Sequence, residues 1–398
     1  MSKTIAVNAG SSTLKFKLFD MPSEDVVAEG TIERIGEKMG HAKIKYGNGQ
    51  KHEEDKPFAD HAAAVNYLLD KLIELKIVAS YDEITAVGHR IVAGGEFFKD
   101  STIIDDDVIS KIDELSEYAP LHEPAELVGI KAFRKVLPNA FAVAVFDTSF
   151  HVDMPEMNAL YSVPYDWYEK YGARKYGAHG TSLRYVSARA AEMLGKPIEE
   201  LKLITMHIGA GASITAVKNG KSFDTSMGFT PVAGITMATR SGDVDPSLIA
   251  FMQGKLNLSS DEMIDILNHK SGLLGISGIS PDMRDILAAA EKGDERAQLA
   301  LDIYVNRIVR YIGAYIAEMG GADAIVFTAG VGENSVPVRK MITDKLDYFG
   351  IKIDQEKNNC HGVERDLSAD DAKIKTLLIP TNEELMIVRD IERLKKNN

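Results

Sequence analysis

Short apolar runs alternate along the chain with longer segments in which apolar residues recur every three or four positions. The runs end in glycine or polar turns, which is typical of strands buried in a parallel sheet. Helical periodicity covers 62–75 and 294–319, and Gly320 and Gly321 end the second helix. This alternation predicts the α/β class. The predicted strands are 4–7, 84–87, 141–146, 201–208, 324–327 and 374–379.

A weak internal repeat relates the two halves of the chain. Residues 5–12 read as a strand entering a turn of small residues, and an alternating strand follows at 14–19. Residues 203–211 and 213–217 repeat that pattern, with Gly10 and Gly209 half a chain length apart. Together with a length that exceeds one usual hydrophobic core, the repeat predicts two similar domains. A chance echo is the alternative that this repeat alone leaves open.

Composition excludes several classes of protein. No apolar run approaches the roughly 18 residues that a membrane helix needs, and no apolar signal region follows Met1. Lysine and arginine total 46 against 59 acidic residues, and the net charge of −13 disfavours nucleic acid and membrane surfaces as partners. The single cysteine, Cys360, excludes an intrachain disulfide. We expect a soluble, cytoplasmic protein in which local cations meet any anionic ligand.

Three turns of small residues follow predicted strands, whereas the familiar nucleotide motifs are absent. Residues 220–222 resemble the end of a P-loop, but Thr215 stands where its first glycine belongs, so Asn219 and Gly220 are better interpreted as a hairpin turn. The three turns lie at Gly10, at 209–211 and at 330–332. Small residues let backbone N–H groups approach phosphate closely, although each turn alone is equally consistent with a plain tight turn.

Hydroxyl groups and cations gather near these turns. Ser11, Thr13 and Lys15 follow the first turn and suit a polyphosphate tail. Arg90 follows a predicted strand, and Arg240 lies in a polar turn. A histidine among glycines, such as His179, is seldom a core residue, because a core position needs no such backbone freedom. An arginine or lysine alone is usually solvated, but the combined set indicates an anion site.

Two carboxylates lie just beyond predicted strands. Asp147 follows 141–146, and Glu383 follows the last apolar run. Thr381 and Glu384 match a capping box, which would explain Glu384 by helix capping alone. Glu383 is not needed for that cap, so two interpretations stay open: a favourable interaction with the helix dipole, or a water-mediated contact with Mg²⁺.

Taken in order, these motifs resemble those of the acetokinase family. The resemblance rests on residues 7–12, 88–90, 119–122, 146–148, 179–182, 239–246, 327–334 and 379–385, and so spans nearly the whole chain. It implies two duplicated ribonuclease-H-like domains of the actin-like ATPase superfamily around a nucleotide cleft. The implied domains are 1–148 with 384–398, and 149–383. The implied activity is reversible phosphoryl transfer from ATP to acetate, in a homodimer.

The resemblance also implies roles for individual residues. Asp147, His179 and Arg240 fall on catalytic positions, and Asn8 and Glu383 position Mg²⁺ or Mn²⁺. The acceptor is expected at Arg90, Val92, Leu121, His122 and Pro231. ATP or ADP is expected at Ser11, Thr13, Lys15, His207, Ile208, Gly209, Ala210, Gly211, Asp282, Met283, Arg284, Gly330, Val331, Gly332, Glu333 and Asn334. Four residues depart from the family pattern, namely Thr13, Ala178, Leu183 and Ala210, and Ala178 could widen the acceptor pocket.

The chemistry of the implied acceptor favours cations over a strong base. A carboxylate has a pKa near 4 and is ionised at neutral pH, so the difficulty lies in bringing one anion to another. Asp147 is then more plausible as an orienting group than as a proton acceptor. Propionate or butyrate kinase is the alternative within the family, since one or two methylenes discriminate weakly. A non-catalytic ATP-binding clasp protein is the alternative from another class.

Overall fold

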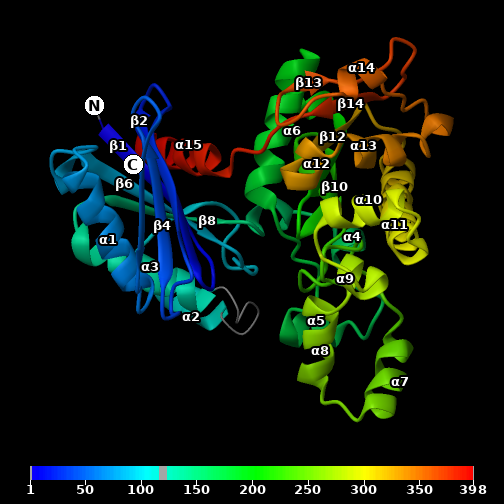
Figure 1. The fold of residues 1–398 in the computed structure, drawn as a ribbon, viewed down its shortest axis with the longest axis horizontal. Coiled ribbons are helices and arrows are strands. Elements are labelled where there is room, and N and C mark those ends of the chain that lie inside the picture. The colour runs from blue at the N-terminus through cyan, green and yellow to red at the C-terminus, as the bar shows by residue number, and fades with distance from the viewer. Residues whose placement is uncertain (1, 116–122, 398) are drawn as a thin grey trace. The chain divides into compact units, whose positions relative to one another are not determined.

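The computed structural model describes residues 2–115 and 123–397. The chain divides into two compact units, which we call unit 1 (Met1–Val152 with Asn382–Asn398) and unit 2 (Asp153–Thr381). Each unit contains one sheet with helices packed against it, which confirms the α/β class (Figure 1). Two of the expected acceptor residues, Leu121 and His122, lie outside the described residues.

Unit 1 is built on a sheet in the order β5-β4-β3-β2-β1-β6-β8-β7. Alternate residues of the central strands pack on opposite faces, as strand geometry requires. Ile5 and Val7 share a core with α1 and α3, whereas Ala6 packs against Ile387 and Ile391 of α15. The elements are β1 (Ser2–Ala9), β2 (Thr13–Met21), β3 (Asp25–Glu33), β4 (Gly40–Tyr46), β5 (Gln50–Lys56), α1 (His61–Glu74), β6 (Ile84–Ile91), β7 (Thr102–Ile103), α2 (Asp106–Leu115), α3 (Glu123–Val136), β8 (Phe141–Phe146) and α15 (Glu383–Lys396).

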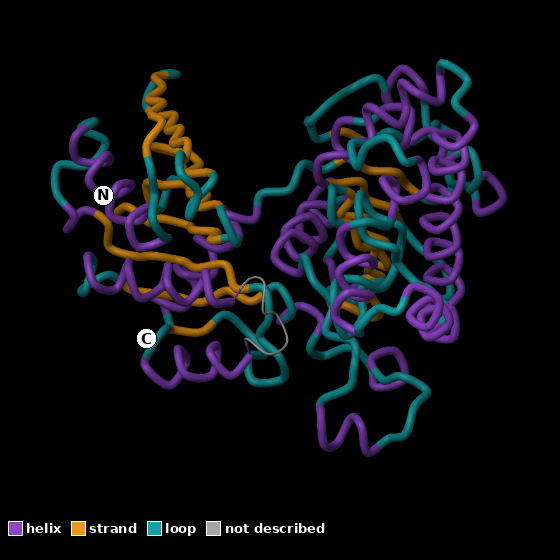
Figure 2. Tube along the Cα trace, turned by 60° about the horizontal axis from the view of Figure 1, so that its bottom comes forward, coloured by secondary structure: helices purple, strands orange, loops and turns teal. Residues whose placement is uncertain are grey.

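Unit 2 is built on a sheet in the order β11-β10-β9-β12-β14-β13. Its strands run through the centre of the unit with helices outside them (Figure 2), and α6 and α11 both pack against β9. The strands are β9 (Lys202–Ile208), β10 (Ala212–Lys218), β11 (Lys221–Thr225), β12 (Ala324–Thr328), β13 (Arg365–Asp366) and β14 (Lys375–Leu378). The helices are α4 (Glu156–Ala159), α5 (Asp166–Tyr171), α6 (Gly180–Leu194), α7 (Pro246–Leu256), α8 (Ser260–His269), α9 (Gly272–Ser277), α10 (Met283–Glu291), α11 (Glu295–Met319), α12 (Ala329–Asn334), α13 (Val336–Thr343) and α14 (Gln355–Asn358).

The two sheets are copies of one topology. The order β3-β2-β1-β6-β8-β7 in unit 1 matches β11-β10-β9-β12-β14-β13 in unit 2, strand for strand. The directions match as well: β1 pairs antiparallel with β2 and parallel with β6, and β9 pairs antiparallel with β10 and parallel with β12. Unit 1 adds the hairpin β4–β5. The duplicated fold that the Gly10 and Gly209 echo predicts is therefore confirmed.

The helices that follow the two sheets are exchanged between the units. Helix α6 comes after β8 of unit 1 in the sequence but packs on β9 and β12 of unit 2. Helix α15 comes after β14 of unit 2 but packs on β1, β6 and β8 of unit 1. Gly88 permits the close approach of α15, because a Cβ at Gly88 would lie 2.2 Å from Cγ2 of Ile387.

The predicted elements appear close to their expected bounds. All six predicted strands are present, and α1 and α11 begin at the side-chain caps Asp60 and Asp294. Gly320 ends α11 with φ +68°, and Asn219 with Gly220 forms the hairpin turn between β10 and β11. Strands β3, β4 and β5 were not predicted, because β5 is polar throughout and polar residues interrupt the apolar ones in β3 and β4.

One local prediction is wrong, and one general rule has an exception. Thr381 does not cap α15: the helix begins at Glu383, so Asn382 is the N-cap and accepts the N–H of Leu385 at 3.3 Å. Glu384 instead pairs with Lys17 at 3.0 Å. His89 also breaks the rule for a histidine beside glycine, since it is buried in the core against Phe133. The glycine before it serves helix packing and gives the histidine no exposure.

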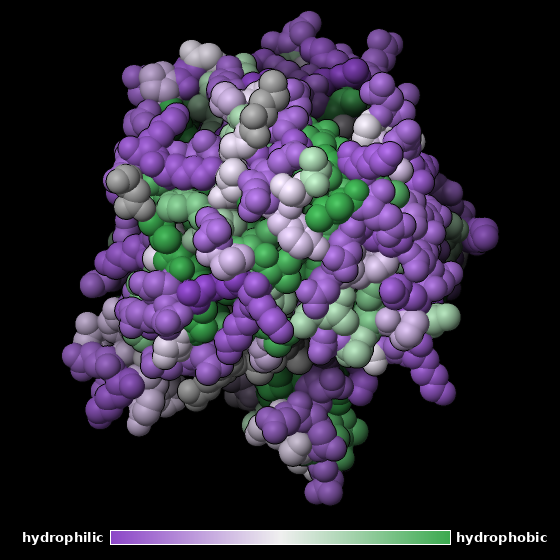
Figure 3. All heavy atoms as spheres, turned by 90° about the vertical axis from the view of Figure 1, so that its left-hand side faces the viewer, coloured by the Kyte–Doolittle hydropathy of each residue, from purple (hydrophilic) through white to green (hydrophobic). Residues whose placement is uncertain are grey.

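The surface of unit 1 that Figure 3 faces is largely hydrophilic, with smaller apolar areas between the polar side chains. Within the described ranges, no helix combines the length and the apolarity that crossing a membrane requires.

Candidate functional site

Strand register in unit 1 aligns three of the expected site residues. Asn8 of β1 pairs with Lys15 of β2 on one side and with Arg90 of β6 on the other. Directly paired residues point to the same face of a sheet, so the three side chains form one row across three strands. Arg90 Nη1 donates to Asn8 Oδ1 at 3.3 Å, which confirms the contact within that row.

Arg90 is the centre of a cluster of oxygen atoms. Its Nη2 donates to Asp147 Oδ2 at 2.5 Å, and its Nε lies 3.6 Å from Glu383 Oε2. Asp147 is buried directly after β8, where its own N–H donates to the carbonyl of Ile91 at 2.9 Å. One guanidinium is therefore held between two carboxylates and the amide of Asn8.

A third carboxylate, Glu126 of α3, interacts electrostatically with Arg90 and Asp147 but was not predicted from the sequence. It is 3% exposed and accepts the N–H of Val92 at 3.3 Å. Burial raises its pKa to about 8, and the charge of Asp147 adds to that rise while Arg90 opposes it. The sequence could have indicated this residue, because Glu126, Ile130 and Phe133 share the i, i+4, i+7 spacing of a buried helix face. A carboxylate is unusual at such a buried position.

The oxygen atoms around Arg90 suit a hard divalent cation. Burial raises the pKa of Glu383 to about 7, with Arg90 opposing and Asp147 adding to the effect. Carboxylates therefore outnumber the cation that they surround. The described residues include no group of three or more His, Cys, Asp and Glu side chains that could hold a metal. Mg²⁺ needs no such cage, since one or two side-chain oxygens with water and phosphate suffice, so Asn8 and Glu383 fit it.

The first glycine turn is held by its neighbours on both sides. Gly10 N–H donates to the carbonyl of Thr13 at 2.8 Å, and the carbonyl of Gly10 accepts from His61 Nε2 at 2.7 Å. His61 begins α1 and was also missed in the sequence, where the helix was expected from residue 62. Ser11 and Lys15 are exposed beside this turn. The turn is thus rigid while its hydroxyl and amine groups face solvent.

In unit 2, the turn at 209–211 joins β9 to β10 and lies beside Arg240. Gly209 N–H donates to the carbonyl of Gly211 at 3.1 Å, and Ala210 is exposed. A Cβ at Gly211 would lie 3.4 Å from Arg240 Nη1 and 3.7 Å from His179 Nε2. The missing side chain therefore leaves space in front of both nitrogen atoms, where an oxyanion could accept from each.

Arg240 has no carboxylate partner among the residues that the structure describes. Among the described residues, its side chain makes one hydrogen bond, a long one in which Nη1 lies 4.0 Å from Met237 Sδ. Burial lowers the pKa of Arg240. A partly buried guanidinium without a counter-ion is costly, and an anionic ligand would remove that cost.

His179 is placed by its backbone and by two neighbouring side chains. It is the N-cap of α6 with φ +61°, a conformation that glycine adopts more readily. Its Nδ1 lies 2.8 Å from Ser213 Oγ. Its ring stacks on His207, with 4.0 Å between centroids and 16° between planes. His207 Nδ1 in turn lies 2.8 Å from Ser182 Oγ.

The third turn contains the short helix α12, which starts directly after β12. Ala329 has φ +64°, and Glu333 Oε1 accepts the N–H of Ala329 at 2.8 Å and of Thr381 at 3.0 Å. Gly330 faces open space, since a Cβ there would meet nothing within 4 Å. The buried Arg339 donates to the carbonyls of Gly332 and Glu333. The carboxylate of Glu333 thus holds the turn together, and Gly330 is its exposed part.

The other expected residues occupy varied positions. Asp282 caps α10 and pairs with the exposed Arg284, while Met283 is buried. Val92 in unit 1 and Pro231 in unit 2 are half-buried. Among the departures, Ala178 is buried in an apolar cluster that includes Met227 and Met237, and Leu183 is fully buried. The effect of Ala178 on the acceptor stays a prediction.

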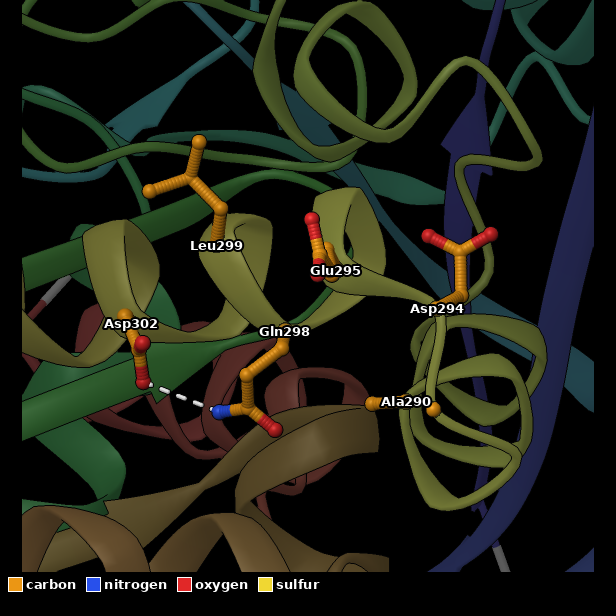
Figure 4. Close-up of a pocket in the computed structure, with 7 residues that line it drawn as sticks. Ala290, Asp294, Glu295, Gln298, Leu299 and Asp302 are labelled. Carbon is orange, nitrogen blue, oxygen red and sulfur yellow. Dashed lines mark hydrogen bonds between the residues drawn. The ribbon is translucent and has the colours of Figure 1, made fainter.

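The surface depression in Figure 4 is a poor alternative site. It has a volume of about 410 Å³ and lies where α10 leads into α11. Asp294 caps α11, and Gln298 donates to Asp302 at 3.0 Å. Its polar groups therefore serve the helix. It is lined by Ala290, Gly293, Asp294, Glu295, Gln298, Leu299 and Asp302, none of them an expected site residue.

Comparison with known proteins identifies the relatives of the chain. The model of the acetokinase family matches residues 3–389. An acetate kinase of Limosilactobacillus fermentum is 77% identical over 396 residues, which is 100% of both chains. The crystal structure of Porphyromonas gingivalis acetate kinase is 45% identical with a TM-score of 0.94, covering 99% of this chain and 100% of that one. A propionate kinase from Francisella tularensis is 40% identical with a TM-score of 0.92, covering 98% and 99%.

We predict that Glu126 makes stability depend on pH. Its raised pKa means that the folded state keeps a proton that the unfolded state loses between about pH 5 and about pH 8. Stability therefore falls as pH rises through this range. Glu126→Gln still accepts the N–H of Val92 but does not titrate, so the wild type should lose on the order of 2 kcal/mol relative to this variant.

Urea unfolding at both ends of the pH range measures the difference. Glu114→Gln, which changes an exposed carboxylate of α2, is the control and should follow the wild type. Parallel curves for wild type and Glu126→Gln would contradict the prediction.

Proposed function

The chain belongs to the acetokinase family, and we propose that it transfers the terminal phosphoryl group of ATP to acetate through the residues described above. The products are ADP and acetyl phosphate, and the reaction is reversible. The observation that carries these roles is the space at Gly211, which faces both Arg240 and His179. A guanidinium that has no carboxylate partner among the described residues, with an imidazole nitrogen beside it, suits a phosphoryl group in transfer.

Phosphoryl transfer to acetate needs charge compensation more than a base. An acetate oxygen attacks the γ-phosphorus in line, and the bond from that phosphorus to the bridging oxygen breaks, leaving the electron pair on ADP. Arg90 holds the acetate carboxylate, while Arg240 and His179 face the transferring phosphoryl. Asp147 orients Arg90 rather than taking a proton, which its 2.5 Å contact with Nη2 supports.

Asn8 and Glu383 are the residues that would hold Mg²⁺, or Mn²⁺ in its place. When bound, the ion neutralises charge on the phosphates. The excess of carboxylates around Arg90 supports this assignment. The turns at Gly10, 209–211 and 330–334, with Lys15 and 282–284, would contact the nucleotide. Unit 1 would then be the N-terminal acetokinase domain and unit 2 the nucleotide-binding domain.

Propionate is the second candidate acceptor. The likeness to a propionate kinase at a TM-score of 0.92 favours it, as does the small Ala178 beside His179. Against it stands the 77% identity to an acetate kinase. Values of kcat/KM for acetate, propionate and butyrate decide between them, and a ratio near one for acetate over propionate would overturn acetate as the preferred acceptor.

The proposed activity is tested through acetyl phosphate, which hydroxylamine converts into acetohydroxamate and free phosphate. The chain should form it from ATP, Mg²⁺ and acetate, and should not form a phosphorylated product from glucose. Removal of divalent ions with EDTA should stop the reaction, and added Mg²⁺ should restore it. Binding of ATP without any acyl phosphate would instead favour the non-catalytic clasp protein.

The lone Cys360 supports a reducing compartment, and we place the protein in the cytoplasm.

A homodimer is the proposed assembly, and α7 supports it. Helices α7 and α8 extend from the body of unit 2 (Figure 1), and α7 contains no buried residue. Leu248, Phe251 and Leu256 of α7 are 49%, 58% and 53% exposed. Apolar side chains gathered in this way usually lie in an interface, and a second copy of this chain is the partner that we propose.

We predict that Leu248→Asp with Phe251→Asp converts the dimer into a monomer. Two charges in an apolar interface are desolvated without partners, so association should weaken at least 100-fold. Light scattering after size exclusion measures the mass. Leu299→Asp, at an exposed leucine of α11, is the control and should leave the mass unchanged. A wild-type chain of monomeric mass would refute the assembly itself.

Arg90→Ala should chiefly weaken acetate binding. Loss of a charge-assisted bidentate contact predicts an increase in the acetate KM of about 10- to 100-fold. Arg90→Lys should recover only part of this loss, because lysine lacks the planar fork. Steady-state kinetics with saturating ATP give the values. Arg134→Ala, which removes a surface ion pair with Asp106, is the control. An unchanged acetate KM in Arg90→Ala would mean that another residue holds the carboxylate.

Gly211→Ala should lower kcat while the protein stays folded. The added methyl meets its neighbours at ordinary contact distance but fills the space in front of Arg240 and His179. Displacing the phosphoryl by about 1 Å predicts a decrease in kcat of about 100-fold. Gly313→Ala in α11, whose Cβ would also meet only distant atoms, is the control. Wild-type turnover in Gly211→Ala would show that the phosphoryl does not occupy this space.

A further inference from the structure

Thr381 bonds to two separate parts of unit 2 and does not cap the helix that follows it. Its N–H donates to Glu333 Oε1 at 3.0 Å, the same oxygen atom that holds Ala329. Its Oγ1 lies 2.7 Å from Ser182 Oγ, on the first turn of α6. The amide and the hydroxyl of Thr381 therefore act on different elements and can be tested separately.

The hydroxyl of Thr381 begins a chain of polar groups that ends at the stacked histidines. Ser182 is buried, and its Oγ lies 2.8 Å from His207 Nδ1. The ring of His207 lies flat against His179, with 4.0 Å between the centroids. His179 Nδ1 is held separately, 2.8 Å from Ser213 Oγ. Each imidazole thus contacts a serine, and among the hydrogen bonds between described residues the serine of His207 continues to a second hydroxyl, that of Thr381.

Proton order along this chain determines the charge of His207. These contacts allow two proton orders, and in one of them Thr381 donates to Ser182 while Ser182 donates its single proton to His207 Nδ1. His207 then carries its proton on Nε2 and is neutral. Two imidazolium rings 4.0 Å apart would repel each other, and Arg240 Nη1 lies near the same space as His179 Nε2. A neutral His207 leaves His179 as the ring that can bear the positive charge.

We propose that Thr381 and Ser182 are positioning residues, which hold a neutral His207 flat against His179 so that the charge of the stacked pair stays on His179. This inference rests on the proposed function, in which His179 faces the transferring phosphoryl. This chain of hydrogen bonds from Thr381 through Ser182 to His207, which we call the relay, acts on the transition state through His179. It should therefore change kcat and leave the KM for ATP nearly unaffected.

The test breaks the relay from both ends. Thr381→Val keeps the shape of the side chain and the hydrogen bond from the backbone N–H to Glu333, but it removes the hydroxyl. Ser182→Ala removes the hydroxyl that lies between Thr381 and His207. Each single variant should lower kcat about 5- to 10-fold, the worth of one hydrogen bond. The double variant should lose no more than the larger single loss, because both changes break one chain. Thr381→Ser restores the hydroxyl and should recover most of the kcat.

Thr376→Val is the matched control. Thr376 lies on β14, which leads to Thr381, and it is fully buried. Its Oγ1 has no hydrogen-bond partner among the described residues, so the same substitution should leave kcat unchanged. A Thr381→Val variant that matches Thr376→Val, additive losses in the double variant, or a loss confined to the KM for ATP would each overturn the inference.

A second measurement does not depend on turnover. In protein labelled with ¹⁵N-histidine, the Nδ1 resonance of His207 should show an unprotonated nitrogen that accepts a hydrogen bond. The resonance should move in Ser182→Ala and in Thr381→Val but stay in place in Thr376→Val. Movement without acyl phosphate formation by the wild type would support the relay and refute the proposed reaction. A resonance that does not move would refute the relay even in an active enzyme.

Discussion

Parallel pairing of β1 with β6 is the constraint on which the candidate site of unit 1 depends. Its register sets Asn8 beside Arg90, and the antiparallel pairing with β2 adds Lys15 to the row. A shift of one residue would turn these side chains to the opposite face, where α1 and α3 pack. Because unit 2 repeats the sheet, the equivalent row joins Ser213, His207 and Thr328. One backbone register therefore positions a cation row in one unit and a hydroxyl–imidazole row in the other. The duplication thus supplies two copies of one geometry with different chemistry.

The parts of the fold that were predictable from the sequence are those that local physics determines. Asn219 with Gly220, the capped helix α11 and the apolar strands each follow from short-range preferences. Strand β5 was missed because pairing with β4, rather than an apolar pattern, holds it. Strands β3 and β4 were missed because their core residues Ile32, Ala42 and Ile44 stand singly between polar residues and form no apolar run. Glu126 was missed because its burial depends on the fold of α3 onto β6. The predicted cap at Thr381 was wrong because a cap depends on which residue starts the helix, and the matching motif lay one residue too early.

Electrostatics differ between the two arginines to which the sequence draws attention. Arg90 contacts two carboxylates, Asp147 and Glu383, so its neighbourhood holds one more carboxylate than it holds guanidinium groups. Arg240 is partly buried with no carboxylate among the described residues, so its neighbourhood holds uncompensated positive charge. Each arrangement is unfavourable alone. A divalent cation would relieve the first and an oxyanion would relieve the second. In a chain with a net charge of −13, this local placement is what makes binding of an anion possible.

Two of the seven non-glycine residues that have positive φ in the described part of the chain lie at the candidate site. His179 and Ala329 adopt positive φ without being glycine, at a cost of about 1 kcal/mol or more each. Packing and hydrogen bonds offset that cost: Ser213 and the stacked His207 hold His179, and Glu333 holds the amide of Ala329. Both sets of contacts meet at Thr381, whose amide reaches Glu333 and whose hydroxyl reaches Ser182. Thr381 is also the last residue of unit 2, directly before the N-cap of α15. Because α15 packs in unit 1, the chain leaves unit 2 after Thr381. The two hydrogen bonds of Thr381 connect this residue to the turn that contains Ala329 and to the helix that begins after His179.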